Sequence, residues 1–300
     1  MTNRAFNATR SEKLFDILNT AFMSLVVVVT LYPFLNVLAI SLNDSTDTVR
    51  GGIYIWPRAF TLQNYSTIFQ YEGLLQGLYI SVLRTVAGTL LGLFSSSMLA
   101  YTLSRIDFQG RRFISVFLAL TMYFTGGLIP VYILMRDLGL IGTFWVYIFP
   151  GMVSAFNVFV IRSFIDGLPY ALQESAKLDG ANDFTIYWRI ILPLCKPVLA
   201  TIALFLAVGQ WNAWFDTYLY NGGKAHLTTL QYELMKVLQS TQQGGAGMNN
   251  VNDMARQMTQ ISPESIKMSI TIIVTVPILL VYPFLQKYFV GGMTLGAVKS

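Results

Sequence analysis

Two stretches of this 300-residue sequence carry polar residues in patterns suited to binding. The first is the charged segment Glu174-Ser-Ala-Lys-Leu-Asp-Gly180, in which small residues lie between charges. Small side chains beside charges let another protein approach closely, so we expect a docking site with Glu174 as its ionic anchor. Gly180 can adopt a left-handed backbone and end a helix, which would set the angle to a second helix. From these residues alone, the alternative interpretation is an amphipathic turn that lies on a membrane surface and docks nothing.

The second stretch is Gln210-Trp-Asn-Ala-Trp-Phe-Asp216. Indole faces can stack on sugar rings, and amide or carboxylate groups can bond sugar hydroxyls. An interfacial aromatic belt with buried hydrogen bonds between helices explains the same residues equally well. If the ligand is an acidic sugar, a free carboxylate would repel it, so in that case Asp216 is expected to pair with a basic side chain of the protein. A solvated Asp216 near the outer end of the helix is the alternative. The candidate substrate-path residues are Tyr123, Asn157, Gln210, Trp211, Asn212 and Trp214.

Residues for catalysis or metal binding are scarce. One histidine, His226, excludes an all-protein zinc site of the usual kind, and one cysteine, Cys195, excludes an internal disulfide. The segment Gly222-Gly-Lys-Ala225 lacks the upstream glycine and the Ser/Thr of a phosphate-binding loop. We therefore expect no catalytic residue, no metal site and no bound cofactor.

The composition is that of a membrane protein. Hydrophobic residues make up 54% of the chain and charged residues only 12%, with a mean hydropathy of +0.54. A soluble domain carries about 25% charged residues, so a soluble enzyme is excluded. The net charge of +5 comes without a dense basic run, which argues against nucleic acid as a partner.

The apolar runs predict an all-α, polytopic fold with six membrane-spanning helices. About 20 apolar residues are needed to cross the hydrocarbon core. The first run resembles a signal peptide but is too long and has no small-residue cleavage site, so we interpret it as a retained helix. The predicted spans are Thr20–Leu42, Gly77–Leu103, Phe113–Met135, Thr143–Phe164, Pro197–Leu219 and Lys267–Val290.

Basic residues predict that both termini are cytoplasmic. With the N-terminus inside, twelve basic residues fall on inner segments: Arg4, Arg10, Lys13, Arg105, Arg111, Arg112, Arg162, Lys177, Arg189, Lys196, Lys287 and Lys299. Seven fall on outer ones: Arg50, Arg58, Arg136, Lys224, Lys236, Arg256 and Lys267. Arg84 lies within the second span, where we expect it to reach the outer interface, with attraction of an acidic sugar as the alternative. Gly88 and Gly92 permit close helix packing.

Two segments between spans are too long for turns. In the inner one, Ile165–Leu192, Pro169 can start a helix, Asn182 or Asp183 can cap a second one, and this second helix is expected to stop before Pro193. The outer one, Tyr220–Ser265, has an amphipathic helical pattern, a flexible piece Gly244–Asn250, and a helix start at Ser262 and Pro263. The helical pattern consists of Leu227, Leu230, Leu234, Val237 and Leu238.

The inner segment carries a family resemblance. Glu174 to Gly180, followed by Ile190 and Leu192-Pro193, resembles the "EAA" loop of binding-protein-dependent ATP-binding-cassette importer permeases. It departs at Ser175, where alanine is usual. The resemblance runs from about Leu75 to the tail Gly291–Lys299, which is similar to the end of the maltose-transporter-type inner subunit. Within this carbohydrate-uptake branch, Gln210 to Asp216 resembles permeases of the lipo-oligosaccharide and alginate type.

The resemblance implies a type I importer fold and a set of partners. Residues 165–193 would hold a coupling helix that docks on a cytoplasmic ATPase through Glu174, Ser175, Ala176, Lys177, Asp179, Gly180 and Ala181. Two ATPase subunits would carry ATP and Mg, beside a second homologous permease, an external solute-binding protein, an oligosaccharide and the lipid bilayer. The outer loop 220–265 would reach into the binding protein, and the tail 291–300 could insert between the ATPases.

This implied organisation comprises a cytoplasmic segment 1–19, a first helix 20–42 and a permease core 75–290 in the bacterial cytoplasmic membrane. Two rival classes fit less well. A secondary transporter or channel tends to have intramembrane carboxylates or broken helices, and carboxylates are almost absent from the span centres. A membrane-embedded enzyme would need a catalytic cluster that the spans lack.

Overall fold

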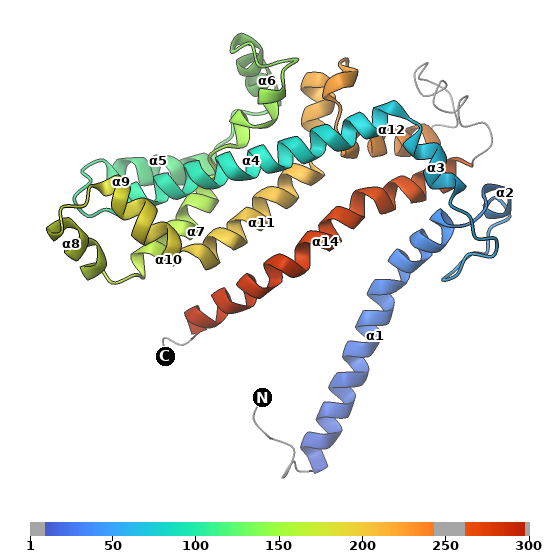
Figure 1. Ribbon diagram of the computed structural model, residues 1–300, viewed down its shortest axis with the longest axis horizontal. Helices are drawn as coiled ribbons and strands as arrows, with labels where there is room; N and C mark the ends of the chain where they lie inside the picture. Colours follow the sequence, from blue (N-terminus) through green and yellow to red (C-terminus); the bar gives the residue numbers. More distant parts are fainter. Residues whose placement is uncertain (1–9, 243–261, 298–300) are drawn as a thin grey trace. The chain divides into compact units, whose positions relative to one another are not determined.

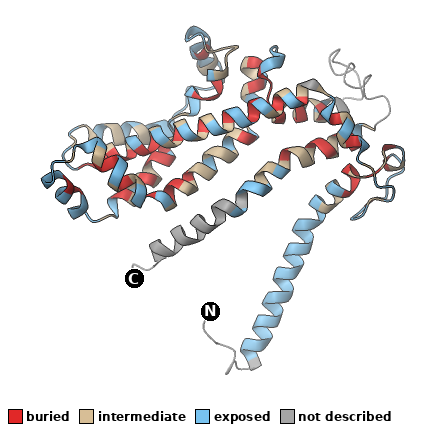
Figure 2. Cartoon of the chain, in the orientation of Figure 1, coloured by how far each residue is buried: buried red, intermediate tan, exposed pale blue. Residues whose placement is uncertain are grey.

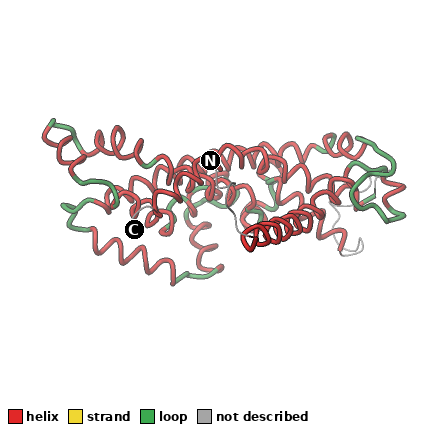
Figure 3. The backbone as a smooth tube through the Cα atoms, turned by 90° about the horizontal axis from the view of Figure 1, so that it is seen from below, coloured by secondary structure: helices red, strands yellow, loops and turns green. Residues whose placement is uncertain are grey.

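The structure, a computed structural model, describes residues 10–242 and 262–297. Across these residues every regular element is helical, which confirms the predicted all-α class, and one isolated bridge joins Asn43 to Phe60 (Figure 3). The chain divides into two compact units. One comprises residues 1–71 and 237–273, and the other residues 72–236 and 274–300.

The first unit is dominated by the long helix α1 (Arg10–Ser41), which is exposed along most of its length (Figure 2). Its apolar side chains therefore need a covering other than this unit, as expected of a membrane helix. The short helices α2 (Ser45–Thr48) and α3 (Gln63–Phe69) follow. The Asn64 amide donates to the carbonyls of Ser41 and Asn43, both at 2.9 Å, and so ties α3 to the end of α1.

The second unit is built around α4 (Glu72–Ser104), against which α7 (Ala155–Asp166) and α11 (Lys196–Asn212) pack (Figure 1). The predicted close packing at the glycine pair is confirmed. A Cβ atom at Gly88 would lie 2.7 Å from Gln210 Cδ, and one at Gly92 would lie 3.3 Å from Leu206 Cδ1. The apolar core lies where the three helices meet and includes Ala100, Leu103, Val158, Ile161 and Ile202.

The third and fourth predicted spans are each bent at a break between two helical pieces. Helices α5 (Arg111–Tyr123) and α6 (Leu128–Asp137) meet at 120°, across a break where Gly127 has a φ of 84°. In the fourth, two short 3₁₀ helices, η1 (Phe144–Tyr147) and η2 (Phe149–Gly151), precede α7 at 50°. Glycine and proline at these breaks are residues that helices tolerate poorly.

Two further helix ends differ from expectation. The fifth span leaves the helix at Ala213, whose ψ is 122°, and resumes as the π-helical segment η4 (Thr217–Asn221). On the inner side, α9 (Asp183–Ile186) does not stop before Pro193. It continues through the π-helical segment η3 (Tyr187–Ile191) into α10 (Leu192–Leu194). The wider π-helical turn leaves room for a proline ring that would clash with the preceding turn of an α-helix.

The outer segment contains the predicted helix, α12 (Leu230–Gln242), preceded by the 3₁₀ turn η5 (Ala225–Leu227). Leu227, Leu230 and Leu234 are buried, as their spacing predicts. The last helix, α14 (Pro263–Ala297), begins as expected, because the Ser262 hydroxyl accepts the Ser265 N–H at 3.1 Å. It extends beyond the predicted end at Val290. The piece Gly244–Asn250 lies outside the described residues.

Among the described residues, three helices are long and apolar enough to cross a membrane alone: 11–41, 73–104 and 263–281. Three bent pairs pass the same test when each pair is taken together. These pairs are residues 111–137, 144–166 and 183–212.

Candidate functional site

The inner loop folds as a helix, a glycine turn and a second helix. Helix α8 (Ala171–Leu178) begins two residues after Pro169, and Gly180 follows it with a φ of 80°. The Asn182 side chain then accepts the Thr185 N–H at 2.8 Å and caps α9. The predicted glycine turn is therefore confirmed, and of the two candidate capping residues it is Asn182 that caps the helix.

The exposed surface of this loop combines charged and apolar side chains. Glu174, Ser175, Asp179 and Gly180 are exposed, whereas Ala176 is buried in the core cluster and Ala181 is half-buried. Sequence reasoning missed the apolar part. Leu178 is 89% exposed, and the rings of Phe184 and Trp188 are also exposed and stack at 6.3 Å. An apolar patch rimmed by charges is typical of a protein-docking surface.

A second candidate site is a cavity of about 520 Å³ beside α4, α7 and α11, lined by polar as well as apolar residues and called the polar cavity below. The structure brings two predicted residues together in its wall, Asn157 from α7 and Gln210 from α11. Sequence reasoning did not anticipate the aromatic part of the wall, which includes Tyr147, Phe205, Phe215 and Tyr220. Amides next to aromatic faces are the groups that bind sugar hydroxyls and sugar rings.

Arg84 lies in the same wall and is paired. Its guanidinium donates from both terminal nitrogens to the carboxylate of Asp216, with Nη1 to Oδ1 at 3.2 Å. Its Nε donates to Gln210 Oε1 at 3.1 Å, and its Cζ lies 4.4 Å from the centre of the Tyr147 ring. Because only 2% of Arg84 is exposed, the expectation that it reaches the membrane interface is wrong. The prediction that Asp216 pairs with a basic side chain is confirmed.

The ion pair also stabilises the break after α11. The chain leaves the helix at Ala213, so the carbonyl of this residue has no partner within the helix. Arg84 Nη1 donates to that carbonyl at 3.2 Å. Gln210 in turn donates from Nε2 to the Tyr147 carbonyl at 3.3 Å, which links α11 to η1.

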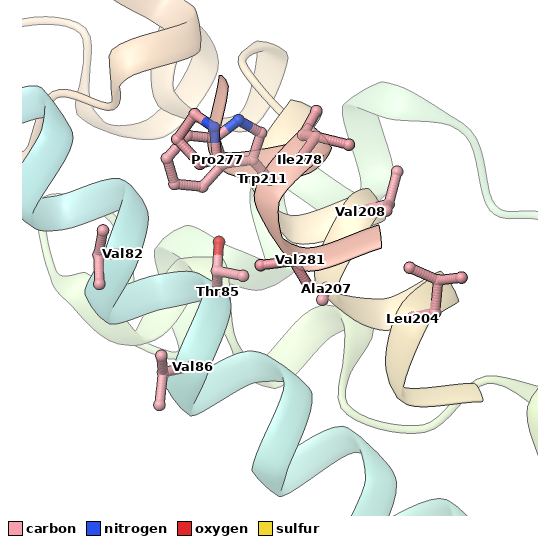
Figure 4. Close-up of a pocket in the computed structure, with 10 residues that line it drawn as sticks. All are labelled: Val82, Thr85, Val86, Leu204, Ala207, Val208, Trp211, Pro277, Ile278 and Val281. Atoms are coloured by element: carbon pink, nitrogen blue, oxygen red, sulfur yellow. The ribbon is translucent and has the colours of Figure 1, made fainter. Parts of the chain in front are cut away.

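The other candidate path residues lie elsewhere. Trp211 is buried and donates to the Val274 carbonyl at 3.0 Å, as in the alternative of hydrogen bonds between helices. Its ring lines a separate, apolar cavity of about 220 Å³ together with Val82, Thr85 and Pro277 (Figure 4). Trp214 packs against Phe215 and Tyr218, while Tyr123 and Asn212 are exposed outside both cavities.

Comparison with known proteins identifies the family. Residues 88–295 match the model of the binding-protein-dependent transport system inner membrane component. This chain belongs to that family. The match confirms the resemblance found at the inner loop, so the chain is an ABC sugar-importer permease, a transport subunit whose ATPase activity is on partner subunits.

Full-length relatives agree with this assignment. The permease is 37% identical to protein LplC of Bacillus subtilis strain 168, over 97% of each chain. It is 36% identical to the polygalacturonan/rhamnogalacturonan transport system permease protein YtcP of the same strain, over 96% of this chain and 99% of YtcP. A crystal structure of a bacterial ABC transporter that imports the acidic polysaccharide alginate contains a chain with 28% identity and a TM-score of 0.83. This match covers 94% of the permease and 99% of that chain.

Proposed function

We propose that this permease moves an acidic oligosaccharide across the bacterial cytoplasmic membrane by ATP-driven alternating access. The observation that carries the proposal is the neutral, polar and aromatic cavity wall, in a chain similar to transporters named for polygalacturonan and for alginate. Both polymers consist of carboxylated sugars. A wall whose one cation is neutralised by Asp216 lets an anionic sugar pass without holding it tightly.

The transporter would contain a second homologous permease, two ATPase subunits and an external binding protein. Each bent helix pair then counts as one span, which gives six spans with both termini in the cytoplasm. The surface formed by Glu174, Leu178, Phe184 and Trp188 would dock in a cleft of one ATPase, where ATP and Mg are bound. ATP binding would close the ATPase pair, move the docked loops and turn the cavity outward. The binding protein then delivers the sugar.

The ends of the chain have supporting roles in this proposal. The outer loop 220–265 would reach into the binding protein and discourage the sugar from rebinding. The tail 291–300 would insert between the ATPase subunits. Both roles rest on the resemblance to the maltose-transporter-type subunit. Residues 243–261 and 298–300 lie outside the described part of the chain.

The test is ATP hydrolysis by the transporter reconstituted in liposomes with its binding protein. Uronic-acid oligosaccharides and neutral oligosaccharides of the same length are presented in parallel. We expect hydrolysis to be stimulated by the acidic series. Stimulation by the neutral series alone would refute the proposed substrate class.

The same assay tests docking through Glu174→Lys. Reversing the charge of an ionic anchor should abolish substrate-stimulated hydrolysis and leave the permease pair assembled. Glu12→Lys is the matched control, since Glu12 is also an exposed glutamate in the first turn of a helix, α1, and lies outside both the inner and the outer loop. Normal stimulation in Glu174→Lys would argue against docking at this surface.

A further inference from the structure

Four charged side chains form a closed ring at the inner loop 165–193, called the docking loop below. They are Arg105, Asp107, Lys177 and Asp183. Arg105 donates to both carboxylate oxygens of Asp107, at 3.1 and 2.8 Å, and its Nη2 lies 3.3 Å from Asp183 Oδ1. The Lys177 ammonium faces the same two carboxylates, at 3.0 Å from Asp107 and 3.8 Å from Asp183. Positive and negative groups alternate around the ring. Hydrogen bonds from Arg105 and then Lys177 hold the pKa of Asp107 well below its usual range, so Asp107 is ionised at neutral pH.

Arg105 is the buried member of this ring. It is 5% exposed, its Nη1 donates to the buried Gln173 Oε1 at 2.9 Å, and its Cζ lies 5.9 Å from the centre of the Tyr101 ring. A buried guanidinium is costly unless its donors are satisfied, so these partners fix its position. The planar fork of donors also imposes a direction on each partner, which a lysine ammonium does not.

The partners belong to three different segments. Asp107 follows the inner end of α4, Gln173 and Lys177 lie on α8, and Asp183 is the first residue of α9. One side chain at the end of α4 therefore holds both helices of the docking loop. Apolar contacts also join the loop to the core, through Ala176 and Ile186, but the hydrophobic effect is non-directional. The ring supplies the orientation that those contacts lack.

Helix α4 connects this ring to the polar cavity. It is unbroken from Ser104, the residue before Arg105, back past Arg84. The two arginines are 21 residues apart, or about 30 Å at 1.5 Å per residue. At the cavity end, Arg84 holds Gln210, the Ala213 carbonyl and Asp216. Arg105 thus directly follows the last residue of α4, and Arg84 lies within the same unbroken helix.

We propose that Arg105 is a positioning residue that fixes the docking loop to α4, so that a displacement of the loop is passed to the cavity as movement of the whole helix. The inference rests on the proposed function, because it assigns Arg105 to the coupling between ATP hydrolysis and sugar movement. Without the contacts of Arg105, the loop still docks on the ATPase, but it moves relative to α4 and no longer displaces this helix. Because a chain of contacts does not by itself demonstrate coupling between two sites, the effect of losing Arg105 on transport must be measured.

The test is Arg105→Gln in the assembled transporter, reconstituted with its binding protein and a uronic-acid oligosaccharide. Losing one set of charge-assisted hydrogen bonds changes the equilibrium constant for holding the loop in place by a factor of about ten or more. We therefore expect stimulated hydrolysis and uptake to fall by at least this factor, while basal hydrolysis and assembly persist. Arg136→Gln is the matched control, because Arg136 also forms an ion pair, with Asp137, but its side chain is 62% exposed. It should behave as wild type.

Two more variants separate positioning from a merely structural role. Arg105→Lys keeps the charge but not the fork, and should restore part of the stimulation. Asp183→Asn removes one charge from an exposed part of the ring, so it should disturb folding less than the Arg105 variants do. If Arg105→Gln fails to assemble, this variant tests whether the ring positions the loop. It should lower uptake per ATP hydrolysed. Wild-type coupling in Asp183→Asn and in any assembled Arg105 variant would overturn the inference. A wild-type transporter that no sugar stimulates would overturn the proposed function, and this inference with it.

Discussion

At the residue scale, the most informative side chain of the permease is Arg84. A charge within an apolar span is visible in the sequence, but its partner is not, because Asp216 lies 132 residues further along the chain. The pairing depends on how α11 ends at Ala213 and on which face of α4 meets that end. Neither follows from local residue patterns, so the sequence predicted that Asp216 pairs with a basic group without identifying which one.

Removing one partner of the Arg84–Asp216 ion pair should lower the stability of the permease more than replacing both partners with neutral side chains. Arg84→Gln leaves a carboxylate without its partner, and removing one partner of a buried ion pair costs about 3–5 kcal/mol. The cost should lie toward or below the lower end of this range, since Asp216 keeps some exposure. The double variant Arg84→Gln/Asp216→Asn has no unpaired charge and should recover most of that loss. The measurement is the melting temperature of the purified complex.

The control for this comparison is an exposed ion pair. Surface ion pairs contribute about 0–1 kcal/mol, so Arg136→Gln should hardly change the melting temperature. If Arg84→Gln melted no lower than Arg136→Gln, the Arg84–Asp216 pair would have no structural role.

At the scale of the elements, the sequence predicted what local chemistry decides. The glycine turn at Gly180, the cap at Asn182 and the start of α14 at Ser262 each depend on a few neighbouring residues. The 120° bend between α5 and α6 and the path through Pro193 depend on packing against other helices, so a hydropathy pattern could not reveal them. For the same reason, hydropathy could not reveal that, of the six candidate substrate-path residues, Asn157 and Gln210 are the two in the wall of the polar cavity.

The contact between α4 and α11 can be tested at Gly88. A methyl group at this position would meet Gln210 Cδ and Nε2, both at 2.7 Å. The Gln210 side chain is held by hydrogen bonds to Arg84 and to the Tyr147 carbonyl, so Gly88→Ala should break them at a cost of about 1–3 kcal/mol. We expect a lower melting temperature and slower uptake.

Gly209→Ala is the matched control for the helix contact. Gly209 also lies in a helix of this packed pair, and a Cβ atom there would have no neighbour within 4 Å. Because alanine is favoured over glycine within helices, the control should be neutral or slightly more stable. Equal melting temperatures for the two variants would contradict a tight contact at Gly88.

At the scale of the whole molecule, function depends on which water-facing segments lie on which side of the membrane. The docking surface must face the cytoplasmic ATPase, and the segment between the first two spans must face outward. Charged residues near the spans predict this orientation. The helices themselves do not, because an apolar helix crosses a bilayer equally well in either direction.

Single cysteines test the orientation directly. In a Cys195→Ser background, Ser66→Cys on α3 should react with a membrane-impermeant maleimide in intact cells. Gln109→Cys, in the exposed turn between α4 and α5, should react only after the membrane is permeabilised. The permease retaining only its native Cys195 is the control and should resist the reagent in intact cells, since this thiol is buried. The reverse labelling pattern would place the docking loop outside the cell, where no ATPase could reach Glu174 and Leu178.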